Sequence, residues 1–243
     1  MSSSAILFNS KTLQHSHLSN FFPFVKHRTV CDAQGAPLQR LTVRLRVPAP
    51  VRAALAAEGV ALGAEVVCSS VEAAYQVAKY CMFMDARYAV EVLLPLSNVR
   101  VSDDAHAALA AKRAGGKGVY LAWKHARSAA GTTKRSLERA YEVQERRFHA
   151  GNLALMLELL WSKFSDNGPM RAALVGTGGA ALHEVGKPSI WTRAGGDALG
   201  LLLQHVRAHL VAGTQAVEEV LSSLPPLAPL AGKRGVKRGR DEQ

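Results

Sequence analysis

The chain has 243 residues, 48% of them hydrophobic, which is enough for one domain with a sizeable core. It has no run of 18 apolar residues and no secretion signal at its start, so we expect no membrane partner and an intracellular location, cytoplasmic or nuclear. Its three cysteines, Cys31, Cys68 and Cys81, lack CxxC spacing, which argues against a zinc site or a disulfide framework.

The net charge of +11 is concentrated in two segments. Residues 112–147 contain 10 Lys and Arg against 3 Asp and Glu, and residues 233–242 contain 5 against 2. Both are candidate contacts for nucleic acid, because cationic side chains neutralise phosphates; a solvated insertion and a solubilising tail are the alternatives. Tyr120, Trp123 and Tyr141 of the first segment are candidates for stacking on bases. The second segment resembles a nuclear import signal.

Alternating and apolar runs predict short secondary-structure elements in the first 100 residues. Strands are expected at residues 5–8, 42–47 and 64–68. A short helix is expected at residues 50–57. A longer helix, capped by Ser69 or Ser70, is expected to run to about residue 94.

The second half is predicted to be mostly helical. A helix should begin at Asp103, and residues 114–147 resemble an extended basic arm whose second half suits a charged, exposed helix. The clearest helix begins at Asn152, because apolar residues recur at helical spacing from there to Phe164. Asp166-Asn-Gly-Pro169 should end that helix and start a short one, with Pro169 in its first turn. Further helices are expected at 198–212, capped by Asp197, and from Thr214 to about Leu224.

The order of these elements predicts a helix-rich, single-domain α+β fold with a few short strands. The domain is expected to span residues 1–224, with the basic insertion at 114–147. The segment 225–243 is expected to be a disordered basic tail.

A polar stripe on the helix at 70–83 carries the sharpest chemical signal. Glu72, Gln76 and Lys79 fall within ~60° of one another on a helix that is otherwise apolar, so the stripe should face a cavity or a partner. Helical side chains lean toward the N-terminus, which should bring the Lys79 amine toward Glu72. Two simpler interpretations remain. Ser69-x-x-Glu72 is also a capping-box pattern, and the stripe is also what a solvated helix edge contains.

Four segments in this order resemble motifs of the NADAR family, named for its association with NAD and ADP-ribose metabolism. The polar stripe matches S-x-E-x-x-Y-Q-x-x-K, from Ser70 to Lys79. The other matches are Leu18-Ser-Asn-Phe-Phe-Pro23, Met156-Leu-Glu-Leu-Leu-Trp-Ser-Lys-Phe164 with Asn167, Arg171, Leu174, Thr177-Gly178, Leu182 and Glu184 after it, and Trp191 followed by Leu199-Gly200, Arg207 and Leu210. The likeness covers residues 6–212, interrupted by 114–147.

The resemblance implies an N-glycosidase that needs no cofactor or metal. Members split early riboflavin-pathway intermediates or remove ADP-ribose from guanine bases, so the implied substrate is nucleotide-like or ADP-ribosylated. The resemblance implies that Glu72 is essential and that a lysine attacks C1 of the ribose, for which we choose Lys79, with Lys163 as the alternative. The substrate-binding residues it implies are Asn20, Phe21, Gln76, Phe148, Trp191 and Asp197.

Several of these residues also have plain structural interpretations. The pattern at Lys163 also fits a helix residue that extends its amine into water, and Trp191 also fits a core residue. Asp197 suits a helix N-cap, and Arg207 suits either a phosphate or a buried acid. The chain departs from the family pattern near the pocket, with Phe148 where Trp is common and Thr192 after Trp191. These departures motivate the alternative of a non-catalytic module that binds ADP-ribose or nucleic acid.

Overall fold

The computed structural model describes residues 5–9, 15–20, 22, 41–97, 107–128, 132–192 and 194–213. This part of the chain is a helix-rich α+β arrangement with short strands, as predicted. In chain order its elements are β1 (Ala5–Phe8), η1 (Ser16–Leu18), β2 (Val43–Arg46), α1 (Ala49–Ala57), β3 (Glu65–Cys68), α2 (Val71–Ala78), η2 (Lys79–Phe83), α3 (Ala86–Tyr88), η3 (Ala89–Leu93), α4 (Leu94–Ser97), α5 (Ala107–Ala114), α6 (Lys117–Arg127), α7 (Lys134–Ser165), α8 (Gly168–Val175), β4 (Ala181–Glu184) and α9 (Ala198–Ala212).

The strands form two separate pairs. β2 and β3 pair antiparallel, with Val43 opposite Cys68, and their alternate residues are buried, as the alternation predicted. β1 pairs in parallel with β4, with Phe8 opposite Glu184. Strand β4 was not predicted, because its Ala-Leu-His-Glu composition has weak strand propensity. It becomes a strand by pairing with a segment more than 170 residues away.

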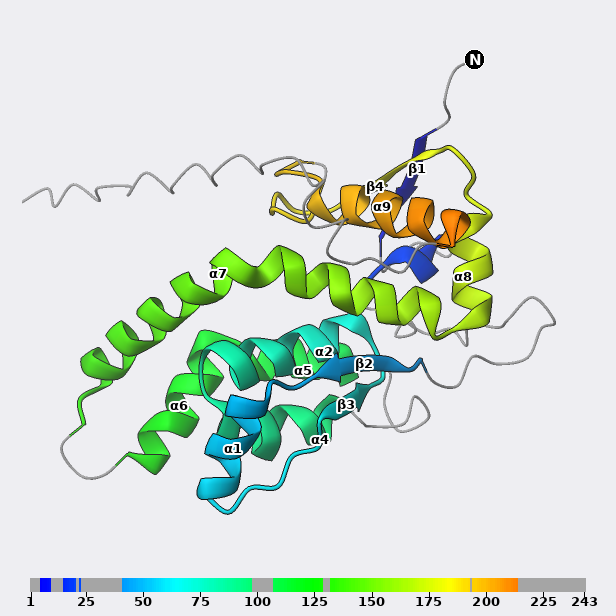
Figure 1. Ribbon diagram of the computed structural model, residues 1–243. Helices are drawn as coiled ribbons and strands as arrows, with labels where there is room; N and C mark the ends of the chain where they lie inside the picture. Colours follow the sequence, from blue (N-terminus) through cyan, green and yellow to red (C-terminus); the bar gives the residue numbers. More distant parts are fainter. Residues whose placement is uncertain are drawn as a thin grey trace, which may run out of the picture.

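Helix α7 is the central element of the fold. Its 32 residues run without a break through Gly151 and Asn152, where a new helix was expected to begin. Gly151 lies against the Phe83 ring, and a Cβ at this position would be 3.2 Å from that ring. In Figure 1, α8, α9, β1 and β4 lie on one side of α7, and α1, α2, α5, β2 and β3 lie on the other. α7 contacts elements on both sides, namely α2 and β2 on one side and α8 and α9 on the other.

The helix expected from residue 70 to about 94 is interrupted. Ser70 is its N-cap, and the α-helical part ends at Ala78. A π-helical turn, η2, starts at Lys79, and Asp85 then caps a new helix by accepting the N–H of Tyr88 at 3.1 Å. π-Helical turns inside helices are rare and are frequent at functional sites.

The basic insertion is a helical hairpin and not an extended arm. α6 and the first half of α7 pack on η2 and α3 through a cluster of aromatic rings, namely Tyr80, Tyr88, Tyr120, Trp123 and Tyr141. Tyr120 and Tyr141 are buried in this cluster, and Trp123 stacks on Tyr120. The prediction that these rings stack on bases is therefore wrong for Tyr120 and Tyr141, because neighbouring rings already cover them.

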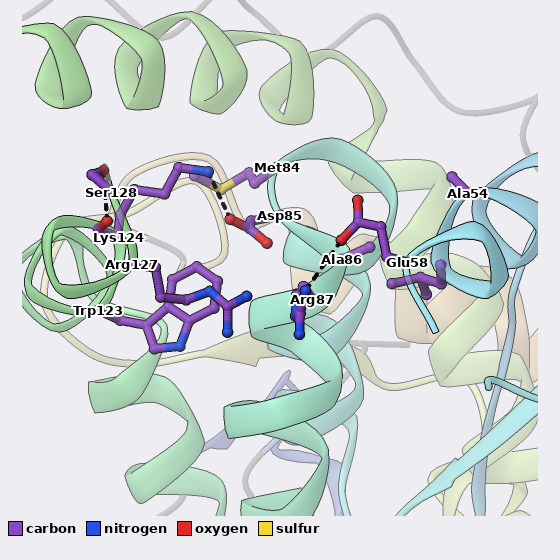
Figure 2. A pocket seen from close by; sticks show the side chains of 11 residues that line it. Ala54, Glu58, Met84, Asp85, Ala86, Arg87, Trp123, Lys124, Arg127 and Ser128 are labelled. Atoms are coloured by element: carbon purple, nitrogen blue, oxygen red, sulfur yellow. Dashed lines mark hydrogen bonds and ion pairs between the residues drawn. The ribbon is translucent and has the colours of Figure 1, made fainter. Parts of the chain in front are cut away.

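A hollow of about 450 Å³ lies between α1, α3 and α6 (Figure 2). Trp123 and Lys124 line one wall, and Asp85 and Arg87 line another. Its charges are paired within the protein, since Lys124 lies 3.0 Å from Asp85 and Arg87 lies 3.8 Å from Glu58. The described residues that line this hollow include none of those predicted for substrate binding or catalysis.

Other predictions concern parts of the chain outside the described residues. These are Phe21, the helix start at Asp103, the helix after Thr214, the end of the domain at residue 224 and the basic tail 225–243. No helix in the described part of the chain has both the length and the apolar character needed to span a membrane.

Candidate functional site

The predicted polar stripe on α2 is buried. Glu72 is 7% exposed, and Gln76 and Lys79 are each 9% exposed. The interpretation of the stripe as a solvated helix edge is therefore wrong. The capping-box interpretation is also wrong, because the N-cap is Ser70, whose Oγ accepts the N–H of Ala73 at 3.1 Å, and this places Glu72 one position too early in the helix.

The Glu72 carboxylate lies between an amide and an ammonium group. Its Oε1 accepts a hydrogen bond from Gln76 Nε2 at 3.0 Å and lies 3.9 Å from Lys112 Nζ of α5. Burial raises the pKa of Glu72, while Lys112, the Gln76 hydrogen bond and Lys79 oppose that rise. A carboxyl group held between these opposing influences can carry charge and can also take up a proton.

Lys79 is directed toward α7. Its Nζ lies 3.5 Å from Glu145 Oε1, and the rings of Tyr80, Tyr141 and Phe148 lie 5.4–5.7 Å from it. We expected this amine to lean toward Glu72, but its ion pair is with Glu145, and Glu72 acts on its pKa only as a weaker influence. Burial lowers the pKa of Lys79, and Glu145 opposes that change. A larger fraction of this amine is therefore neutral than in water, and aromatic rings surround it.

An aromatic wall adjoins the stripe. The Tyr75 ring makes edge contacts with Phe148 at 5.2 Å and with Trp191 at 5.8 Å between centroids. Phe148 is buried and also contacts Phe83, so in this structure it supports Tyr75 and Lys79. Trp191 is half-buried, which leaves part of its ring exposed beside Tyr75.

The turn at residues 16–20 is tied directly to the stripe. The backbone carbonyl of Asn20 accepts the N–H of Glu72 at 2.9 Å. The Asn20 side chain is buried and its Nδ2 lies 3.4 Å from Met156 Sδ. Its Oδ1 is buried and has no hydrogen-bond partner among the described residues. A buried orphan acceptor at this position suits a ligand that brings a donor.

Asp197 stands at the N-cap position of α9, but its carboxylate does not cap the helix. The residue has a left-handed backbone (φ 58°), which is unusual without glycine, and its Oδ2 lies 2.5 Å from His183 Nδ1. Its Oδ1 is buried without a partner in the described part of the chain. The expectation of a capping carboxylate is therefore wrong. The carboxylate instead links α9 to β4, which carries His183.

Lys163 is fully buried on α7, so the interpretation with its amine in water is wrong. Its Nζ donates to the Ser19 carbonyl at 2.8 Å and lies 4.9 Å from the centre of the Phe164 ring. Burial lowers the pKa of Lys163 to about 7, and Glu184 opposes this. Glu184 has a pKa raised to about 7, first by burial and then by repulsion from Glu72.

Arg207 forms no ion pair with an acid in the described part of the chain, and phosphate binding by this residue stays a prediction. Its guanidinium donates to the hydroxyl of Thr177 at 2.7 Å, in the glycine-bearing turn after α8. Buried Arg207 therefore holds this turn against α9.

No protein-family model matches the chain, and no curated protein matches it significantly. The function is therefore inferred from the residues of the site. The structure brings Glu72, Gln76, Asn20 and Lys112 into contact. It also places Lys79, at the start of η2, beside Phe148 of α7.

Sequence reasoning missed three residues of this site: Lys112, His183 and Glu184. Glu184 was part of a matched motif but had no role assigned, and its strand was not predicted. Lys112 was counted only as one charge of the basic segment at residues 112–147. His183 had no visible signal, because its partner Asp197 lies across a loop.

Proposed function

We propose that the chain is an N-glycosidase with a NADAR-like fold, which hydrolyses the bond between a nitrogen base and a ribose in a nucleotide-like or ADP-ribosylated guanine substrate. The observation that carries this proposal is the buried Glu72 carboxylate, held by Gln76 and Lys112 in the motif that resembles the family. The proposed reaction uses neither a metal nor a redox cofactor.

The chemistry of N-glycoside cleavage matches what Glu72 can supply. Positive charge grows on the ribose and negative charge on the departing base as the bond breaks. A carboxylate in a water-poor site stabilises that positive charge far better than one in bulk solvent. The half-buried Trp191 and the Asn20 loop beside Glu72 are the proposed contacts for the base and the ribose, with Asp197 as a hydroxyl acceptor.

Lys79 is the proposed nucleophile. Its neutral amine attacks C1 of the ribose, and the base leaves with the bonding electron pair and takes up a proton. Opening of the sugar ring then gives a protonated Schiff base, with the ring oxygen accepting a proton. Water adds to this C=N bond and the amine is released. Burial, which lowers the pKa of Lys79, favours the neutral amine needed for the first step.

The main test compares the wild type with Glu72→Gln on ADP-ribosylated guanine DNA and on N-ribosyl nucleotides of the riboflavin pathway. Glutamine keeps the acceptor for Gln76 but removes the charge, so kcat should fall about 10²–10⁴-fold. Released base is measured by mass spectrometry. Glu142→Gln, an exposed glutamate on α7, is the matched control and should retain full activity. Unchanged activity of Glu72→Gln would show that the assigned mechanism is wrong.

The choice of nucleophile needs a separate experiment. Borohydride reduction during turnover should fix the sugar to the chain, and peptide mapping should find it on Lys79. Lys79→Met should abolish the adduct and Lys163→Met should not. An adduct on Lys163 would transfer the nucleophilic role to that residue.

A second candidate function is binding of nucleic acid without cleavage, and the surface of α7 favours it. Arg135, Arg139 and Arg146 are exposed, and helical spacing places them on the side opposite buried Leu137 and Tyr141. Replacing the three arginines with Gln should lower the salt dependence of DNA binding by about 2–3 in log–log slope. DNA binding with no turnover of any substrate by the wild type would favour this function over the enzymatic one.

A further inference from the structure

Lys112 of α5 connects the buried carboxylate to solvent. Its Nζ is 3.9 Å from Glu72 Oε1, yet its side chain is 51% exposed, whereas that of Glu72 is 9% exposed. The other two lysines of the described site differ in this respect. Lys79 is enclosed by Glu145 and aromatic rings, and Lys163 is fully buried. Lys112 is therefore the site lysine that an incoming ligand can reach first.

The backbone that carries Lys112 is firmly fixed to α2. Gly115, three residues later, donates its N–H to the Ala111 carbonyl at 2.7 Å and accepts the Tyr80 hydroxyl at 2.6 Å. It also packs so closely on Gln76 that a Cβ would lie 2.4 Å from the amide oxygen. The base of the Lys112 side chain is thus held in place, while its flexible stem lets the ammonium group move between Glu72 and solvent.

The acidic side chains around the site would hinder an anionic ligand unless a cation such as the Lys112 ammonium offsets them. Glu72, Glu184 and Asp197 are all acidic, so an anionic ligand would be repelled on approach. Lys112 acts on Glu72 and Glu184 alike, which places it near both carboxylates. The 3.9 Å ion pair between Lys112 and Glu72 contributes little stability by itself, because the Lys112 side chain is half-exposed.

We propose that Lys112 binds the phosphate of a phosphorylated N-ribosyl substrate and so selects nucleotides over nucleosides. This inference rests on the proposed function for its substrate, but phosphate binding itself does not require turnover. The phosphate belongs either to a 5′-monophosphate or to the pyrophosphate of an ADP-ribosyl group. When Lys112 turns to it, Glu72 loses its nearest cation and becomes a stronger base as the substrate arrives.

The test uses Lys112→Gln with Arg113→Gln as the matched control, because Arg113 is exposed and carries the same charge one residue later on α5. Calorimetry with ribose 5-phosphate, ADP-ribose and unphosphorylated ribose measures binding alone. Lys112→Gln should weaken binding of the phosphorylated ligands about tenfold or more and leave ribose unaffected. Arg113→Gln should change neither, and Lys112→Arg should retain binding. If Lys112→Gln weakens the binding of ADP-ribose more than that of ribose 5-phosphate, the group that Lys112 binds is the pyrophosphate.

Kinetics on a nucleotide and its matching nucleoside supply the second readout. Loss of phosphate binding should raise KM for the nucleotide about tenfold with little change for the nucleoside. If Lys112 serves only to keep Glu72 ionised, its removal will shift the pH profile equally for both substrates, and the inference is overturned. Equal binding of phosphorylated ligands by the wild type and Lys112→Gln also overturns it. A wild type that binds ribose 5-phosphate through Lys112 but cleaves nothing would instead contradict the proposed function alone.

Discussion

Replacing Lys163 with Met is expected to change the pH dependence of stability in a defined direction. The Lys163 ammonium is fully buried and its pKa falls from 10.5 to about 7. Below pH 7 both the folded and the unfolded chain hold this proton, so the full cost of burying the charge is present. Between pH 7 and 10.5 the unfolded chain binds more protons than the folded one. The stability of the wild type should therefore rise with pH in that range, relative to the variant.

The size of the effect follows from the pKa change. One pKa unit corresponds to about 1.4 kcal/mol, so the whole change from 10.5 to about 7 is worth about 5 kcal/mol. Between pH 7 and 9 the difference between wild type and Lys163→Met should change by about 2–3 kcal/mol. The variant also leaves the Ser19 carbonyl without this donor, which costs about 1–3 kcal/mol at every pH and does not alter the slope.

Urea unfolding at constant ionic strength from pH 6 to 9.5 measures this difference. Glu184 also titrates near pH 7 and interacts with Lys163, so the comparison is repeated between Glu184→Gln and the Glu184→Gln/Lys163→Met double variant. Lys134→Met, an exposed lysine at the start of the same helix, should show no change in slope. Parallel pH curves for the wild type and Lys163→Met would refute the claim that burial lowers the pKa of this amine to about 7.

Three substitutions test the packing around the site and the cap of α2, and a fourth, Gly118→Ala, is a control. Gly115→Ala should displace the Gln76 amide, cost about 1–3 kcal/mol and lower the rate of base release, because its Cβ would lie 2.4 Å from the amide oxygen. Gly200→Ala should cost about 3 kcal/mol or more in urea unfolding, since its Cβ would meet a backbone carbonyl of β4 at 2.0 Å; Gly118→Ala, which meets nothing within 4 Å, should be close to neutral. Ser70→Ala removes the α2 cap and should lower stability by about 1 kcal/mol in the same assay.

Local patterns predicted the parts of the fold that depend on neighbours in sequence. The apolar spacing from Leu153 to Phe164 gave the core-facing side of α7, and the alternation at 42–47 gave β2. The start of α7 was misplaced because Gly151 and Asn152 look like a helix boundary. In the structure Gly151 makes room for the Phe83 ring, a contact between segments almost 70 residues apart.

The basic insertion shows how composition can hide a packed element. Glycine, alanine and cationic residues between 114 and 147 outnumber the aromatic ones, so the segment resembles a solvated arm. Its fold depends on Tyr120 and Tyr141, which pack on Tyr80 from another helix. The residue pattern of the insertion alone does not predict this packing, because the partner ring, Tyr80, lies in η2.

The same difference between local sequence patterns and contacts of distant segments explains which features of the site were predicted. Periodicity alone placed Glu72, Gln76 and Lys79 on one stripe, and burial followed from the apolar residues around it. Their partners were not predictable, because Lys112 and Glu145 come from helices about 40 and 70 residues away.

Helix α2 owes its geometry to two distant turns. The 16–20 turn accepts the Glu72 N–H at Asn20 and is itself held by Lys163 through Ser19. The α5–α6 turn is held on the other side by the Tyr80 hydroxyl. The carboxylate is thus positioned by backbone groups of segments that share no local pattern with it. A change far from Glu72 in sequence that loosens either turn should therefore alter the reacting geometry while leaving the motif from Ser70 to Lys79 intact, and a matching motif alone does not guarantee a working site.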